Sequence, residues 1–266
     1  ATILRGLEEI YVKEWLSHHF RIGVSKVYLM PVPSSDKNSN VSYLKTIVCG
    51  DPRIEIVCHT PQHQWNADCR TPVGPTRRNQ IDFMVAHLIP SHLNEWIMLI
   101  DIDEFIQIGR GHMNIRPVLK RFERLGAKAV RVNWVTYGHN NVLDEKSGAV
   151  VSTYRTKSSS QCEFNSISKE MIRAEKNMRS ICQPGDCDAA LAHQQIKIHP
   201  SDRFYANGEL MNRTLPRIAP DTPPVQNPWL VLNHYMKKSQ PEYFRKIAVY
   251  NRMGQVSESR YRPGGA

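Results

Sequence analysis

The stretch Trp96-Ile-Met-Leu-Ile-Asp-Ile-Asp-Glu-Phe105 decides the fold of this chain. It begins with five apolar residues in a row, a pattern typical of a strand that is covered on both faces of a sheet. Three carboxylates follow at once, on Asp101, Asp103 and Glu104. Ligands of open α/β sheets bind at the carboxyl ends of the strands. The stretch therefore predicts an acidic site at the end of a buried strand.

Strand and helix patterns alternate on both sides of this stretch. Apolar runs predict further strands at residues 2–4, 26–30, 43–49, 54–58, 129–135 and 230–233. Helical spacing predicts helices at residues 8–20, 80–88, 115–125 and 241–251. The alternation predicts one α/β domain over residues 1–266, with a mixed, mainly parallel sheet flanked by helices. The pattern loosens after residue 140, which predicts a less regular C-terminal part.

The composition is that of a globular protein. Of the 266 residues, 41% are apolar and 23% are charged, which excludes a disordered chain, a coiled coil and a disulfide-rich miniprotein. No apolar run approaches the roughly 20 residues that span a bilayer, so we expect no transmembrane segment. The expected location is soluble and cytoplasmic. A catalytic fragment of a secretory-pathway enzyme is the alternative.

The cysteines and the net charge limit the kinds of site and ligand that can be expected. The six cysteines include no Cys-x-x-Cys pair, so a structural zinc site is not expected. Cys182 and Cys187 flank a turn and fit a local disulfide, with free thiols as the alternative. Thirty-five Lys and Arg against 25 Asp and Glu give a formal charge of +10. The basic residues are scattered along the sequence, which suits either plain solubility or a small anionic substrate better than a nucleic-acid duplex.

The spacing of Asp101 and Asp103 indicates a metal. Alternate residues of an extended chain point the same way, so the two carboxylates would repel each other without a cation between them. Mg²⁺ and Mn²⁺ take oxygen ligands, typically one or two carboxylates together with substrate phosphates. The pattern thus predicts a divalent ion that holds a diphosphate. A solvated acidic turn is the alternative.

Two further groups of residues carry chemistry. In the segment Asn233-His-Tyr-Met-Lys-Lys-Ser239, His234 fits a metal ligand, Lys238 a phosphate contact and Ser239 a donor at a helix start. A helix cap beside a surface lysine is the alternative. Earlier in the chain, Trp134 and Tyr137 precede Gly138 at a strand end, where aromatic faces suit a sugar ring; a buried core tryptophan is equally compatible.

These segments, in this order and spacing, resemble family-92-type glycosyltransferases and their glycosyltransferase-2-like bacterial and viral relatives. The family's Tyr-Leu-x-Glu-Trp-x-x-His-His helix matches residues 11–19, its Asn-Ser-Ser-Asp loop residues 33–36, and its Gln before the central helix Gln80. The family's Asp-x-Asp-Glu-Phe matches residues 101–105, Trp-x-x-Phe-Gly residues 134–138, and His-Tyr-x-x-Lys-Ser residues 234–239. The resemblance extends over residues 3–250.

The resemblance implies a GT-A fold, a Rossmann-like arrangement, and a transferase activity. Residues 1–140 would bind a nucleotide sugar, a UDP-sugar foremost, and residues 141–266 would form the acceptor side. A hexosyl or pentosyl group would pass with inversion to a hydroxyl of a glycan or glycoprotein, with Mn²⁺ or Mg²⁺ as cofactor. The acidic residue that contacts the nucleoside in the family falls here at Pro31 or Val32, which leaves uracil recognition to other groups such as Asp36.

The resemblance also implies roles for individual residues. The implied metal ligands are Asp101, Asp103 and His234. The implied donor-binding residues are Arg5, Asp36, Gln80, Asp101, Lys238 and Ser239. Trp134 and Tyr137 would contact the acceptor. The motifs do not identify the general base; Asp188 and Glu209 are candidates in the irregular part, and Glu104 is a third. For His18 and His19 we expect a structural role.

Two other functions compete with this interpretation. A metal-dependent phosphoesterase or nucleotidyltransferase would also use paired aspartates, but it usually needs more clustered His and Asp ligands to hold two ions. A nucleic-acid-binding module would account for the positive charge, but no zinc finger, RNA-recognition motif or basic-region helix is present in the sequence. We therefore expect no nucleic-acid partner.

Overall fold

A computed structural model describes most of the chain. The described residues are 2–5, 11–32, 39–48, 50–59, 65–66, 77–109, 112–139, 149–160, 162–179, 196–211, 224–236, 238–239 and 241–244. Asp36, Asp188, Cys182 and Cys187 lie outside them, as does most of the predicted closing helix. None of the described helices is long and apolar enough to cross a membrane.

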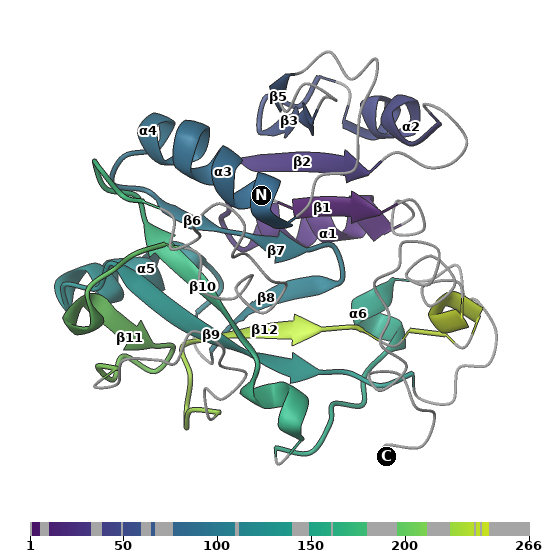
Figure 1. Ribbon diagram of the computed structural model, residues 1–266. Coiled ribbons are helices and arrows are strands. Elements are labelled where there is room, and N and C mark those ends of the chain that lie inside the picture. Colours follow the sequence, from purple (N-terminus) through teal and green to yellow (C-terminus); the bar gives the residue numbers. More distant parts are fainter. Residues whose placement is uncertain are drawn as a thin grey trace.

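Helices of moderate length surround the strands (Figure 1). They are α1 (Val12–Arg21), α2 (Ser39–Val48), α3 (Arg77–Phe83), α4 (Ile89–Ser91), α5 (Ile115–Arg124) and α6 (Val150–Thr153). A π-helical turn at Met84–Leu88 joins α3 to α4, and 3₁₀ turns occur at Glu163–Ser166 and Pro200–Asp202. After α1, Gly23 has φ +99, the left-handed conformation in which glycine commonly ends a helix.

A parallel sheet occupies the N-terminal side of the structure. It contains β3 (Ile54–Ile56), β2 (Val27–Val32), β1 (Thr2–Arg5) and β7 (Ile100–Asp101), in that spatial order. All three pairings are parallel, and Ile3 of β1 lies opposite Asp101. The carboxyl ends of β1, β2 and β7 therefore meet at one edge of this sheet.

A larger, curled sheet continues the structure below the first one in Figure 1. Its order is β6 (Trp96–Met98), β10 (Ser168–Arg173), β9 (Ala129–Thr136), β12 (Leu230–His234) and β8 (Glu104–Ile108), and β11 (Arg203–Tyr205) also pairs with β9. Strand β9 is parallel to β11 and β12, whereas the other three pairings are antiparallel. A short pair, β4 (Cys58–His59) and β5 (Trp65–Asn66), lies apart from both sheets.

The structure confirms an α/β fold but corrects the expected strand directions. Only the four-stranded sheet is wholly parallel, and the larger sheet is mixed with more antiparallel than parallel pairings among the described strands. One cause is the turn at residues 102–103, which lets the chain double back from β7 into β8; another is β10, which is antiparallel to both of its neighbours. Strand β8 then pairs with β12 in the antiparallel sense.

One predicted strand was wrong, and strands β5, β8, β10 and β11 were not predicted. Residues 43–49 were expected to be extended because they form a short apolar run, but residues 43–48 belong to helix α2. Leu44 of this helix is fully buried, so packing on the sheet overrides the local preference. Strand β10 has the sequence Ser-Lys-Glu-Met-Ile-Arg and is buried almost throughout. Its three charged residues are untypical of a buried strand, so the sequence did not indicate one.

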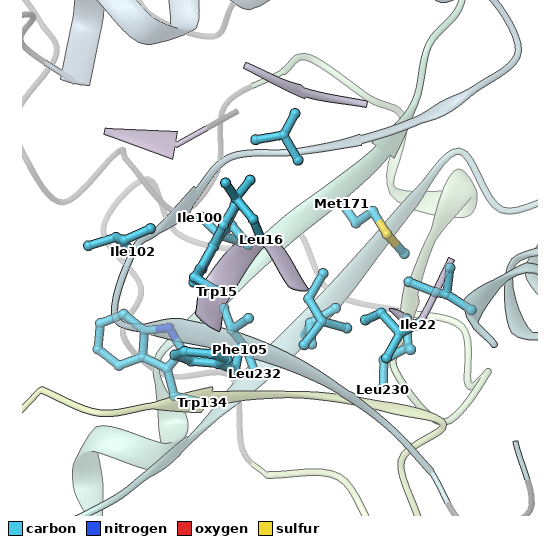
Figure 2. Packing of buried hydrophobic residues seen from close by; sticks show 14 of the residues in the cluster. Trp15, Leu16, Ile22, Ile100, Ile102, Phe105, Trp134, Met171, Leu230 and Leu232 are labelled. Atoms are coloured by element: carbon cyan, nitrogen blue, oxygen red, sulfur yellow. The ribbon is translucent and has the colours of Figure 1, made fainter. Parts of the chain in front are cut away.

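The main apolar core lies between α1, α5 and the two sheets. Figure 2 shows side chains of this cluster, among them Trp15 and Leu16 of α1, Phe105 of β8 and Leu232 of β12. A second cluster on the other side of the strands contains Met84 and Leu88 of the π-helical turn. The strands are thus covered on both faces, as the apolar run at residues 96–100 predicts.

Helix α1 is hydrogen-bonded to the edge of the larger sheet. The Trp15 indole donates to the Glu104 carbonyl (2.8 Å), His18 Nε2 lies 2.7 Å from the Ile106 carbonyl, and the Ile106 N–H donates to His19 Nε2 (3.3 Å). Strand β8 is the last strand in the order of this sheet, and α1 supplies partners for its backbone. These contacts confirm the expected structural role of the two histidines.

Candidate metal and donor site

Residues from distant parts of the sequence meet where β7, β8 and β12 end or begin. Asp103 lies in the turn between β7 and β8, and His234 is the last residue of β12. The pairing of β12 with β8 places His234 opposite Glu104, and the Tyr235 N–H donates to the Asp103 carbonyl (2.9 Å). As a result, His234 Nε2 lies 3.5 Å from Asp103 Oδ1.

The residues around His234 fix the orientation of its imidazole ring. The Trp134 indole packs on it with ring centroids 4.1 Å apart, because β9 and β12 run in parallel side by side. The Nδ1 atom of His234 is buried and accepts or donates no hydrogen bond within the described residues. The imidazole therefore has its Nε2 directed at the Asp103 carboxylate and its face against an aromatic ring.

Asp101 has a different partner. Lys169 of β10 is only 1% exposed, and its ammonium donates to Asp101 Oδ2 (2.8 Å) and to Glu104 Oε2 (2.5 Å). The Asp101 N–H also donates to Glu104 Oε2 (2.6 Å). One internal lysine thus holds the first aspartate and the glutamate of the acidic segment together and neutralises part of their charge.

Glu104 is the most buried carboxylate of the group. Burial raises its pKa, nearby Lys169 acts in the opposite direction, and the neighbouring Asp101 carboxylate raises the pKa further. Its Oε1 atom has no hydrogen-bond partner within the described part of the chain. A carboxylate in an ion pair with an internal lysine is poorly placed to take a proton from an acceptor in solution, so the geometry does not favour Glu104 as a general base.

Lys238 lies close to the start of α1. It is only 6% exposed, and its ammonium sits over the ring of Tyr11, 4.7 Å from the ring centre. Within the described residues it makes no ion pair of 4.0 Å or less. A buried ammonium is costly unless negative charge lies near it. The Glu242 carboxylate interacts with Lys238 without forming such an ion pair, and the position also suits an anionic ligand. The expected alternative, a surface lysine, does not fit this burial.

Ser239 and Glu242 form a helix cap beside Lys238. The Ser239 N–H and hydroxyl both donate to Glu242 Oε2, at 3.1 and 2.7 Å, at the start of the helical turn at residues 241–244. This is a capping box, and Tyr11 and Tyr154 also donate to Glu242. Burial would raise the pKa of Glu242, but these hydrogen bonds and Lys238 lower it below its usual value. The cap fixes the backbone next to Lys238.

The two aromatic residues proposed for the acceptor lie near His234 but in different settings. Trp134 is 9% exposed and is covered by His234. Tyr137 is half-buried and stacks on Tyr235, with ring centroids 4.7 Å apart. Tyr235 in turn makes an edge contact with Phe105. Of the pair, Tyr137 therefore leaves more of its ring accessible to a sugar.

Other predicted site residues lie elsewhere. Glu209 is exposed in the turn after β11, where its carbonyl accepts from Tyr205. Tyr205 pairs with Arg131 of β9, five residues before the end of that strand, or about 16 Å away at roughly 3.3 Å per residue. The structure therefore does not bring Glu209 to His234. Gln80 is fully buried in α3, and Arg5 ends β1, its side chain being outside the description.

The Asp103–His234 pair fits a divalent ion. Two ligands at about 2.1 Å from one ion, at right angles, lie roughly 3 Å apart, so the observed 3.5 Å separation requires only a small movement. The described residues contain no group of three or more His, Cys, Asp or Glu arranged around one ion. The remaining positions would thus fall to water and to a phosphate ligand, as is usual for Mg²⁺.

Lys169, which binds Asp101 and Glu104, is not among the site residues that the sequence predicts. Its segment, residues 169–173, resembles only loosely the Lys-Ser-Ile-Val-Arg segment of the family. The signal was the lysine itself, since a charged residue in the middle of a buried strand needs a partner of opposite charge. Comparison of the sequence with the known protein families and with curated proteins finds no match.

Proposed function

We propose that this chain is a metal-dependent glycosyltransferase with a GT-A fold, which transfers a sugar from a nucleotide-sugar donor to a glycan hydroxyl. The observation that carries the proposal is the meeting of Asp103 and His234, 3.5 Å apart. They come from the two motifs on which the resemblance mainly rests, and these lie far apart in the sequence. Chance matches to short motifs have no reason to converge in space.

The buried ammonium of Lys238 supports a phosphate-bearing ligand. It follows the strand that carries His234 and lacks an ion-pair partner within the described residues. A diphosphate held by the metal at Asp103 and His234 would offer an anion on the same side of β12. The parallel sheet brings the carboxyl ends of β1, β2 and β7 to one edge, and nucleotides bind at this edge in open α/β sheets.

Each residue has a defined task in the proposed reaction. Asp103 and His234 would hold Mn²⁺ or Mg²⁺, which when bound offsets the charge that develops on the leaving diphosphate. Lys238 would bind a phosphate oxygen. Asp101, fixed by Lys169, would accept a hydrogen bond from the donor, and Tyr137 would stack on the acceptor sugar. Inverting transfer also needs a base for the acceptor proton; the described residues favour neither Glu209 nor Glu104, and Asp188 remains a candidate.

A disulfide provides evidence on the cellular compartment of the protein. Cys58 is disulfide-bonded, while Cys162 is a free thiol. Structural disulfides persist in oxidising compartments and are rare in the cytosol. This bond supports the alternative of a catalytic part of a secretory-pathway enzyme over a cytoplasmic location.

A thermal-shift screen of nucleotide sugars tests the proposal. A ligand at 100 times its Kd adds about 2.7 kcal/mol to stability, which shifts Tm by about 5–10 °C for a chain of this size. We expect one nucleotide sugar to produce this shift with Mn²⁺ and not with EDTA. Lys238→Met should reduce the shift, and the exposed control Lys176→Met should not.

Two outcomes would oppose this function. If no nucleotide sugar shifts Tm with either ion, the donor site does not exist as described. If the protein instead releases inorganic phosphate from simple phosphate esters in the presence of metal, the phosphoesterase interpretation replaces the transferase.

A further inference from the structure

A cavity of about 470 Å³ lies at the amino ends of strands β2 and β6. Val27 and Tyr28 of β2 line it, as do Trp96 and Ile97 of β6. The acidic turn instead follows the carboxyl end of β7, and none of the described residues proposed for the metal ion or the donor lines the cavity. The cavity is therefore separate from the candidate metal site, and its volume is in the range of ligand pockets.

Apolar side chains from both core clusters form the interior of the cavity. Leu88 and Ile97 belong to the second cluster. Trp15, Ile100 and Met171, which Figure 2 labels, belong to the main one. Pockets that bind small molecules typically have such a mainly apolar lining, with a few polar groups that orient the ligand. The interior thus suits the apolar part of a ligand.

The polar groups on the β2 and α4 side of the cavity bind one another. The Tyr28 hydroxyl lies 2.7 Å from His92 Nε2, and His92 Nδ1 lies 3.2 Å from Glu95 Oε2. The ammonium of Lys26 lies 3.3 Å from a carboxylate oxygen of Glu55. Because these groups already have partners, a ligand is not needed to satisfy them on this side.

The α5 side of the cavity carries an excess of positive charge. Arg116 and Lys120 lie one turn apart on this helix and both line the cavity. Neither makes an ion pair of 4.0 Å or less within the described residues. The one carboxylate that α5 contributes to the lining is that of Glu123, which accepts from the Trp96 indole (3.0 Å). This side therefore favours a negatively charged group.

We propose that the cavity binds an amphiphilic anion, with an acyl or aryl chain between the apolar walls and a carboxylate at Arg116 and Lys120. A guanidinium group can donate two parallel hydrogen bonds to a carboxylate, and the lysine adds a second positive charge. An amphiphilic cation would be repelled by the same two side chains. The proposal does not rest on the glycosyltransferase activity.

The test compares decanoate with decanol, an uncharged probe with the same chain length, by isothermal titration calorimetry at submicellar concentrations. Wild type should bind both. Lys120→Glu should weaken decanoate binding about tenfold, because an attraction becomes a repulsion, and should leave decanol binding unchanged. The matched control is Arg124→Glu, which reverses an exposed charge one turn further along α5, outside the lining, and should change neither affinity.

A second variant locates the binding site. Leu119 of α5 lines the cavity, so the larger side chain of Leu119→Trp should fill it and abolish binding of both probes. Urea denaturation verifies that this variant is folded.

Three results would overturn the proposal. Wild type could fail to bind decanoate at millimolar concentration, Lys120→Glu and Arg124→Glu could weaken decanoate binding equally, or folded Leu119→Trp could bind as wild type does. Because neither probe requires Mn²⁺ or a nucleotide sugar, these outcomes leave the proposed transferase function untouched.

Discussion

Lys169 shows how a single residue organises the acidic segment. Its ammonium bonds to both Asp101 and Glu104 in a buried setting. Breaking a buried ion pair by removing one partner costs about 3–5 kcal/mol, because the other charge is left without compensation. We expect Lys169→Met to lower the free energy of unfolding by this amount, measured by urea denaturation.

The matched control is Lys128→Met. Lys128 pairs with Glu175 and Asp202 at the surface, where ion pairs contribute about 0–1 kcal/mol. A second variant, Lys169→Met with Glu104→Gln, removes both buried charges and should recover part of the loss. If Lys169→Met and Lys128→Met cost the same, the buried network is not important for stability.

His19 makes stability depend on pH. Burial lowers the pKa of His19 from 6.5 to about 3, with neighbouring His18 acting in the same direction and the hydrogen bond to the Trp15 carbonyl in the opposite one. The unfolded chain binds a proton near pH 6.5 and the folded chain does not, so the free energy of unfolding falls as the pH drops below 6.5. Between pH 6.5 and pH 5 the loss from this residue is about 2 kcal/mol.

The measurement is urea denaturation of wild type and His19→Gln across this pH range. Glutamine does not titrate, so the variant should show a shallower fall in stability below pH 6.5 than wild type. Parallel curves for the two proteins would mean that His19 is protonated in the folded state, contrary to its burial.

The sequence predicts residue types at the site better than it predicts their partners. The aspartates and His234 stand out because their motifs are local, and the structure brings Asp103 and His234 together. The role of Lys169 could not be deduced in the same way, because it depends on what lies opposite in another element. A helix cap at Ser239 was the alternative that the sequence offered, and the structure shows this cap. The burial of Lys238 is likewise a property of the packing around Tyr11.

At the scale of elements, α1 connects several parts of the molecule. Besides its bonds to β8, it accepts two hydrogen bonds through Glu14, from the N–H groups of Val150 (2.6 Å) and Val151 (3.0 Å) at the start of α6. Helix α6 has no side-chain cap of its own at Ala149. Glu14 thus caps a neighbouring helix and also meets the positive end of its dipole.

Replacing Glu14 should therefore loosen α6. We expect Glu14→Ala to cost about 1 kcal/mol of stability and to speed hydrogen exchange at Val150 and Val151. Glu14→Gln keeps an acceptor and should cost less. Unchanged exchange at both amides in Glu14→Ala would show that another group caps this helix.

Elements with one dominant local pattern were predicted well. Helices α1 and α5 and strands β9 and β12 lie where the apolar spacing places them, with ends differing by a few residues. Helix α2 was not predicted, because its β-branched residues favour a strand locally while its packing favours a helix. A mixed sheet was predicted, but the excess of antiparallel pairings in the larger sheet was not, since strand direction depends on the turns and on which strands meet across the sheet.

At the scale of the whole molecule, the disulfide gives a simple test. Cys58 and its partner use two of the six cysteines, so at most four should react with a thiol reagent in denatured, unreduced protein. Protein purified from an oxidising compartment should show this count, rising to six after reduction. Six reactive thiols before reduction would contradict the disulfide and remove its support for a secretory-pathway location.

The most direct test of the central claim is Mn²⁺ binding measured by electron paramagnetic resonance, in the presence of UDP. We expect one bound Mn²⁺ for wild type and at least tenfold weaker binding for Asp103→Asn and for His234→Gln. Two controls away from the site, the partly buried Asp202→Asn and the exposed His112→Gln, should bind like wild type. Equal Mn²⁺ affinity in wild type, Asp103→Asn and His234→Gln would show that this pair is not the metal site, and the proposed function would lose its main support.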